Sequence, residues 1–156
     1  MFTVEESIDI GCAADDVFAY VSDQTNAPRW QRGLREVRRT TEGPIGLGTR
    51  HSVVRTFMGR TLELSNEYTR YEPNRLIEFK IAGTMPAHAS YVVEPAGTGR
   101  ARLTSRIEMR APGPFRVAEP LMAARLRKDV ESNLRNLKDL LEASAEERPV
   151  PGGVPD

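Results

Sequence analysis

The sequence contains few of the residues that form metal sites, disulfides or nucleophilic centres. It has one cysteine, Cys12, and two histidines, His51 and His88, which lie far apart and lack the spacing of metal-binding motifs. A single cysteine excludes an internal disulfide, in agreement with a reducing compartment. We therefore expect neither a metal ion nor a cofactor. Cys12, at the end of a predicted strand, is interpreted as a small half-buried residue rather than a nucleophile.

A surplus of charge of either sign is also missing. The 22 basic and 22 acidic residues give a formal net charge of zero and form no long block, which argues against a nucleic-acid partner. No apolar run approaches the ~18 residues of a membrane span, and the N-terminal residues do not follow the pattern of a secretory signal. We expect a soluble, cytoplasmic protein, and the oligomeric state stays open.

The longest periodic stretch, residues 119–143, predicts a helix with one apolar face. Asn133 is the only polar residue on the apolar face of this helix. We therefore expect it to face the interior and to need a hydrogen-bonding partner, either in the sheet or on a ligand. The apolar residues recur at steps of three and four, which is typical of an amphipathic helix: Met122, Leu126, Val130, Leu134, Leu137 and Leu141.

The preceding segments predict two short helices and an antiparallel sheet. Phe2–Ile10 alternates with period two, a helix follows at 13–22, and a second, very short helix begins behind a candidate cap at Asn26 and stops at Gly33. Turn sequences then separate six further strands, at 34–41, 49–58, 60–71, 76–82, 87–94 and 100–109. The pattern predicts one α+β domain over residues 1–145, followed by a flexible tail rich in Pro and Gly at 146–156.

The strand at 49–58 is ambiguous, because both of its faces carry apolar residues. Its register is left unassigned. The face that carries His51 and Arg55 is more typical of a solvated surface, and if it turned inward the two side chains would form an acid–base or anion-binding pair.

Several short patterns follow one another along the chain: Ile10, Val17-Phe18, Ser22-Asp23, Trp30, Val37, Gly48-Thr49, Tyr71-Glu72-Pro73, Leu137-Lys138 and Leu141-Glu142. Their order and spacing resemble the START-like, helix-grip (SRPBCC) superfamily, and specifically its polyketide cyclase/dehydrase-like branch. The chain departs from the family pattern at Ala13, where proline is usual. The resemblance implies a curved seven-stranded antiparallel sheet around a long C-terminal helix, with two short helices after the first strand and a cavity between sheet and helix.

This resemblance implies a ligand-binding role and leaves two alternatives open. Members bind sterols, lipids, polyketides, plant hormones or quinones, so we expect binding of a mainly apolar small molecule in a hydrophobic cavity. The first alternative is a cofactor-independent cyclase or dehydratase in which Arg55, His51 or Tyr91 moves protons. The second is a protein-binding module similar to the chaperone activators, with an exposed apolar patch on the sheet.

The expected ligand-binding residues come from the inward faces of these elements, and no catalytic residue is assigned. Trp30, the only tryptophan, either caps the mouth of the cavity or anchors the short helices to the sheet. Polar points interrupt the apolar walls at Asn66 and Ser105, where a ligand or the backbone would satisfy them. The full set is Trp30, Asn66, Tyr68, Phe79, Tyr91, Ser105, Met122, Leu126, Val130, Asn133 and Leu137.

Overall fold

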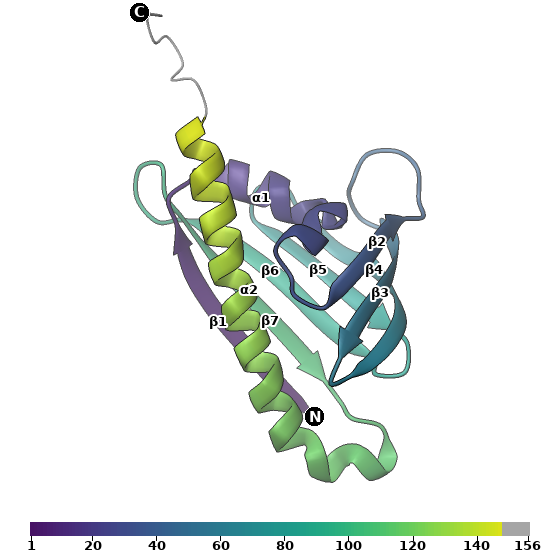
Figure 1. Cartoon of the computed structure of the whole chain (residues 1–156). Coiled ribbons are helices and arrows are strands. Elements are labelled where there is room, and N and C mark those ends of the chain that lie inside the picture. The colour runs from purple at the N-terminus through teal and green to yellow at the C-terminus, as the bar shows by residue number, and fades with distance from the viewer. Residues whose placement is uncertain (148–156) are drawn as a thin grey trace, which may run out of the picture.

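A computed structural model describes residues 1–147 and contains one antiparallel sheet with a long helix across it (Figure 1). The strands lie in the order β1-β7-β6-β5-β4-β3-β2, so that β2 to β7 form a meander and β1 pairs with β7. Their bounds are β1 (Phe2–Ile10), β2 (Leu34–Arg39), β3 (Arg50–Phe57), β4 (Arg60–Glu72), β5 (Leu76–Ala82), β6 (Ala87–Pro95) and β7 (Ala101–Met109).

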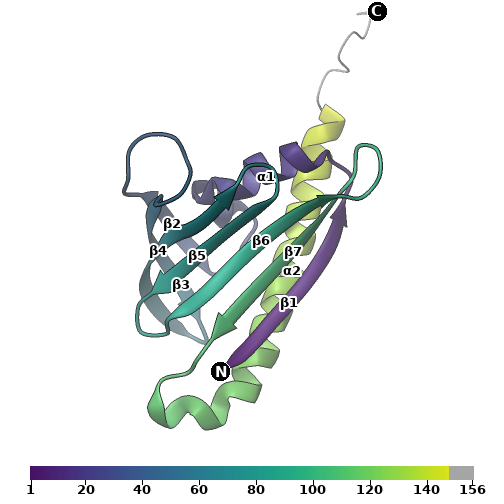
Figure 2. The same cartoon turned by 180° about the vertical axis from the view of Figure 1, so that it is seen from behind.

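Four helical segments complete the fold, and the predicted α+β class is confirmed. They are α1 (Ala14–Ser22), the 3-10 helices η1 (Gln24–Arg29) and η2 (Gly113–Ala118), and α2 (Glu119–Glu147). Figures 1 and 2 show the sheet curving around α2, which lies along β1 and β7. No helix in the described part of the chain is both long and apolar enough to cross a bilayer. Helix α2 includes the first two residues of the segment predicted as a tail, and the rest of that segment lies outside the described residues.

The predicted strand ends differ from the observed ones by at most two residues, and the larger differences concern the helices. Helix η1 begins behind Asp23, whose side chain accepts the N–H of Thr25 at 3.1 Å, rather than behind Asn26. Asn26 instead donates its Nδ2 to the carbonyl oxygen of Tyr20 at 3.2 Å. The cap moves because Asp23 directly follows α1 and has the extended backbone that a helix cap requires. Helix η2 was not predicted, since its Gly-Pro sequence is also typical of a loop.

Helix α2 is held to the end of β1 by hydrogen bonds as well as by apolar packing. Lys138 Nζ donates to the carbonyl oxygen of Asp9 at 2.9 Å and to Glu142 Oε2 at 2.7 Å. The same Glu142 oxygen accepts the N–H of Gly11 at 2.9 Å. Lys138 and Glu142 belong to the sequence pattern that carries the family resemblance, and their contacts give that pattern a structural reason.

The main core lies where α2 covers the β1–β7 end of the sheet. Val4 and Leu103 on the strands and Leu137 on the helix are fully buried. Burial of a Val or Leu side chain contributes about 1.5–3 kcal/mol, so this contact is a large part of what fixes α2 on the sheet. Because this end of the sheet is closely packed, any cavity must lie at the other end, beneath η1 and β2.

His51 and Arg55 lie on the face of β3 that turns inward, whereas a solvated face was favoured from the sequence. Opposite these residues on β4 stand Asn66 and Leu62, and Val53 lies between them on the same face. Because side chains alternate with period two, burying Val53 also turns its two polar neighbours inward. His51 is 1% exposed. The predicted solvated face is therefore wrong.

Candidate functional site

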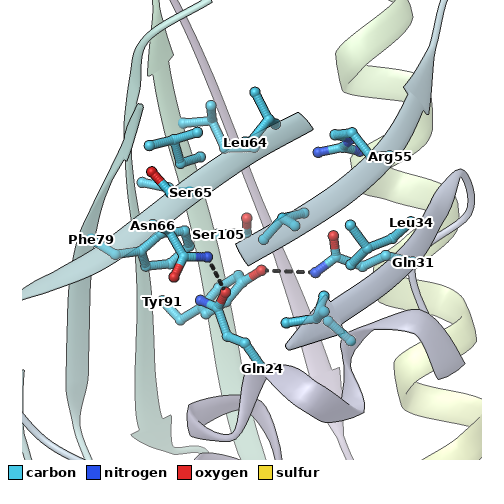
Figure 3. A pocket seen from close by; sticks show the side chains of 16 residues that line it. Gln24, Gln31, Leu34, Arg55, Leu64, Ser65, Asn66, Phe79, Tyr91 and Ser105 are labelled. Atoms are coloured by element: carbon cyan, nitrogen blue, oxygen red, sulfur yellow. Dashed lines mark hydrogen bonds between the residues drawn. The ribbon is translucent and has the colours of Figure 1, made fainter. Parts of the chain in front are cut away.

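A small cavity lies between the concave face of the sheet and the segment formed by η1 and β2. Its volume is about 70 Å³. Two further compartments of about 30 Å³ each adjoin it, one beside α2 and one toward the β3–β4 turn. Arg55 lines all three compartments. Figure 3 shows it among the residues that line the central one. The space is below the ~300–1,000 Å³ of typical ligand pockets, so a ligand larger than a few atoms requires the walls to move.

Arg55 is a half-buried cation without a partner among the described residues. Its Nε is buried and makes no hydrogen bond, and within residues 1–147 its guanidinium forms no ion pair. Asp129 lines the compartment beside α2 with Arg55, yet its carboxylate pairs with Arg125 at 3.5 Å. Burial lowers the pKa of Arg55, and electrostatic interactions with Tyr91 and Asp129 oppose this shift. An unpaired buried charge is unfavourable, which marks this position as one that a ligand can stabilise.

Tyr91 presents a neutral hydroxyl to the same space. Gln31 Nε2 donates to its oxygen at 3.1 Å, so the proton of the hydroxyl stays available for a further acceptor. Burial raises the pKa of Tyr91 to about 12, only partly offset by the Gln31 hydrogen bond. The ring is held by Trp30 and Phe79, with centroid distances of 6.0 and 5.7 Å. Tyr91 can therefore donate a hydrogen bond from a fixed position.

A buried polar chain runs along the other side of the cavity. His51 Nδ1 and Asn66 Oδ1 are 2.9 Å apart, and Asn66 Nδ2 donates to Gln24 Oε1 at 2.6 Å. Since the Asn66 oxygen faces the ring, Nδ1 carries the proton of His51. Gln24 Nε2, at the cavity wall, is buried without a partner. Figure 3 shows Gln24 and Arg55 on different sides of the space, which thus has an unsatisfied donor on each.

Eight of the eleven predicted ligand-binding residues line the three compartments. Asn66, Phe79, Tyr91 and Ser105 line the central one, and Trp30, Leu126, Val130 and Asn133 line the one beside α2. The other three predicted residues are buried elsewhere. Tyr68 donates its hydroxyl to the carbonyl oxygen of Ser22 at 2.6 Å, whereas Met122 and Leu137 pack in the core: these belong to two separate apolar clusters.

Two of the predicted residues have structural contacts that bear on their roles. Asn133 Oδ1 accepts the N–H of Arg32 at 2.9 Å, so its partner is the loop after η1 rather than the sheet. Trp30 is 4% exposed, and its carbonyl oxygen accepts Asn136 Nδ2 at 3.3 Å, which ties the end of η1 to α2. Trp30 therefore anchors the short helix and also lines the compartment beside α2. Its contact with a ligand stays a prediction.

Three polar residues of the site were not among the predicted set. Gln24 and Gln31 lie in and after a short helix whose sequence has no apolar period, so no pattern indicates which way they point. Arg55 had a usable signal, since it shares a strand face with Val53 and Phe57. Among residues 1–147, no three side chains from His, Cys, Asp and Glu converge as metal ligands would.

Comparisons with known proteins agree with this architecture. A family model described as "Polyketide cyclase / dehydrase and lipid transport" matches residues 1–142. A protein from Thermus thermophilus has a TM-score of 0.78 at 16% identity, with 92% of this chain and 99% of that chain covered. The Zhui aromatase/cyclase from Streptomyces sp. R1128 has a TM-score of 0.69 at 17% identity, covering 98% of this chain and 99% of that chain.

A START superfamily protein from Mycobacterium smegmatis is also similar, with a TM-score of 0.67 at 15% identity and coverage of 93% of this chain and 97% of that chain. No curated protein matches the sequence. At such low identities the solved structures show a shared fold, and they carry no information on the ligand.

Proposed function

The chain belongs to the polyketide cyclase/dehydrase and lipid transport family, and we propose that it binds a small, mainly apolar molecule whose acidic oxygen pairs with Arg55. The observation that carries the proposal is the unpaired guanidinium that lines all three compartments. A bound carboxylate or enolate would supply the missing counter-charge. Charge-assisted hydrogen bonds to a guanidinium are among the strongest in proteins.

The other donors of the cavity define the rest of the ligand. The free hydroxyl proton of Tyr91 and the unpartnered Nε2 of Gln24 suit carbonyl or hydroxyl oxygens at a distance from the acidic one. The walls between these donors are apolar, with Leu64, Phe79 and Ile107 among them. A compact apolar acid that carries one further oxygen fits this arrangement, and an unbranched hydrocarbon would leave the donors unsatisfied.

A second candidate, a cyclase or dehydratase, is supported by three groups in one compartment. Arg55, Tyr91 and Asp129 all line the space beside α2. Tyr91 could protonate a leaving oxygen, Asp129 could accept a proton, and Arg55 could stabilise the enolate between them. We favour binding, because Asp129 is already paired with Arg125 and because His51 lines none of the three compartments.

The exposed apolar residues favour a ligand-binding role over the chaperone-activator alternative. That alternative requires an apolar patch on the sheet. In residues 1–147, the large exposed apolar side chains lie in turns, at the N-terminus and around the start of α2, whereas ion pairs such as Arg102–Asp9 and Arg106–Glu5 lie on the outer face of the sheet.

The test of the binding proposal is the preference of the protein for an acid over its neutral analogue. Cyclohexanecarboxylate and its methyl ester have the same ring and differ in charge. We expect the wild type to bind the acid at least about tenfold more tightly in calorimetric titrations. Arg55→Met should abolish this preference, and its midpoint of denaturant unfolding should be equal to or higher than that of the wild type, because a buried unpaired charge is removed.

Arg35→Met is the matched control. Arg35 is exposed on the neighbouring strand β2, so its replacement should leave both the preference and the unfolding midpoint unchanged. Equal affinities of the wild type for acid and ester, or a preference that survives in Arg55→Met, would contradict the proposal.

A further inference from the structure

One corner of the molecule carries apolar side chains that the core does not use. We call it the η2 corner and define it as residues 58–60, the turn between β3 and β4, together with residues 110–121. Figures 1 and 2 show η2 projecting beyond the ends of the strands there. Val117 is 90% exposed, Leu121 64%, Phe115 56% and Met58 50%. Large apolar residues at such exposure are unfavourable in water unless a partner covers them.

The packing beneath this surface is already complete. A buried cluster of Phe57, Ala111 and Met122 joins the end of β3 to the start of α2, and Phe2 and Met85 pack against it. The exposed residues lie outside this cluster and are not needed to close it. Their exposure is therefore not the result of incomplete packing in the core.

The net charge of the η2 corner is positive. Arg60, Arg110 and Arg116 form no ion pair within residues 1–147. The one carboxylate of the corner, Glu119, accepts the N–H of Ala111 and the ammonium of Met1, each at 3.0 Å. Elsewhere many arginines are paired, as in the ion pairs on the outer face of the sheet. The corner thus combines exposed apolar side chains with uncompensated positive charge.

The η2 corner also adjoins the cavity. The compartment toward the β3–β4 turn is lined by Phe57, Leu62 and Met85, and Arg55 also lines it. Phe57 and Met85 are shared with the cluster beneath the corner. A partner on this surface would therefore lie next to the apolar side of the ligand-binding space.

We propose that the η2 corner docks on the surface of an anionic lipid bilayer. Phe115, Val117 and Leu121 would enter the boundary between head groups and acyl chains, and Arg116 with its two neighbouring arginines would contact lipid phosphates. A bilayer suits the corner better than a protein does, because its charge is spread over a plane and needs no matched pattern of acidic side chains. The proposal goes beyond ligand binding and does not depend on Arg55.

The experiment measures binding to vesicles by flotation at low salt. Phosphatidylcholine vesicles with and without about 30 mol% phosphatidylglycerol separate the two contributions. We expect the wild type to float with the anionic vesicles and to bind the neutral ones at least about fivefold more weakly. The double variant V117D/L121D should lose at least about tenfold in binding to the anionic vesicles, and Arg116→Gln should lose roughly threefold.

Leu47→Asp is the matched control for the acidic substitutions. Leu47 is 75% exposed in the loop before β3, at the other end of that strand from Met58, and its replacement should leave vesicle binding unchanged. All the substituted side chains are exposed, so thermal melting should confirm that the variants are folded. Arg55→Met should bind vesicles as the wild type does, which separates this proposal from the preceding one.

Two outcomes would overturn the proposal. One is that the V117D/L121D variant floats with anionic vesicles as well as the wild type does. The other is that the wild type does not float with anionic vesicles. In that second case light scattering would be informative, since the wild type could be dimeric and the V117D/L121D variant monomeric. The η2 corner would then be an interface between two copies of the chain.

Discussion

His51 is a buried histidine with one satisfied ring nitrogen and one unsatisfied one. Nδ1 is bonded to Asn66, and Nε2 is buried and lacks a partner. Burial lowers the pKa of His51, and Arg39 lowers it further, although Asn66 and Asp23 oppose the shift. The ring is therefore neutral in the folded state at pH values where a free histidine begins to bind a proton.

This difference makes stability depend on pH in one direction. As the pH falls through about 6.5, the unfolded chain binds a proton at this position and the folded chain does not. The free energy of unfolding should then decrease as the pH is lowered, with a slope of at most about 1.4 kcal/mol per pH unit, until the lowered pKa of the folded state is reached. Chemical denaturation between about pH 7.5 and 5.5 measures this slope.

The two histidines provide the variant and its control. His51→Gln keeps a donor for Asn66 and removes the titration, so the slope should largely disappear even if the variant is less stable at every pH. His88 is exposed, and His88→Gln should retain the slope of the wild type. A slope that survives in His51→Gln would show that another group causes it.

Site residues on strands with one clear apolar face could be predicted from the sequence, whereas others could not. Tyr91 and Asn66 lie on such strands, and the structure places both at the cavity. The facing of Arg55 was left open, with solvent favoured, because both faces of its strand carry apolar residues, and pairing with β4 shows which face turns inward. The position of Gln24 depends on a 3-10 helix, and the sequence predicted the start of that helix behind the wrong capping residue.

At the scale of elements, one glycine sets how β2 meets β3. Gly33 has φ +79°, and a Cβ built there would lie 2.6 Å from the carbonyl oxygen of Thr56. The carbonyl oxygen of Gly33 also accepts the N–H of Thr56. The turn thereby places Leu34 opposite Arg55, at the edge of the cavity.

We expect Gly33→Ala to destabilise the protein by about 1–3 kcal/mol, because a left-handed backbone and a contact with backbone are both unfavourable for alanine. Gly46→Ala is the control, since that residue has no positive φ and nothing within 4 Å of its added Cβ. Its effect should stay within about 0.5 kcal/mol. Unfolding in urea measures both variants, and equal effects would contradict this account of Gly33.

Most elements could be predicted because their periods are local properties of the sequence. Helix α2 repeats its apolar residues over many turns, and strands such as Leu76–Ala82 alternate between flanking turns. The side of an element that faces the core could not be predicted where both of its sides contain apolar residues. For β3 that choice depends on its neighbours in the sheet, which local patterns do not contain.

At the scale of the whole molecule, the cavity would have to widen to admit the proposed ligand. A cavity of about 150 Å³ can hold a benzene molecule, whereas the central cavity has a volume of about 70 Å³. The compartment beside α2 lies between Trp30 and Leu126. We expect a separation of η1 from α2 to enlarge this compartment, since Trp30 follows η1 and Leu126 lies on α2.

Such widening should be visible in the emission of Trp30, the only tryptophan. Binding of cyclohexanecarboxylate should shift the emission maximum, because the ring lies at the wall that moves and its polarity changes with occupancy. In Arg55→Met the same concentrations should produce no shift. Calorimetric binding by the wild type without any change at Trp30 would place the ligand away from α2.

The pairing of β1 with β7 has a consequence for how the chain reaches its native state. Val4 lies opposite Ile107, so the strand at the start of the sheet finds its neighbour only after about a hundred intervening residues are in place. Such a non-local contact is slow to form. During synthesis, residues 2–10 leave the ribosome long before β7 and α2, and their apolar face stays uncovered until then. We therefore expect the yield of folded protein to fall when this segment is left unprotected during synthesis, because an uncovered apolar strand promotes aggregation.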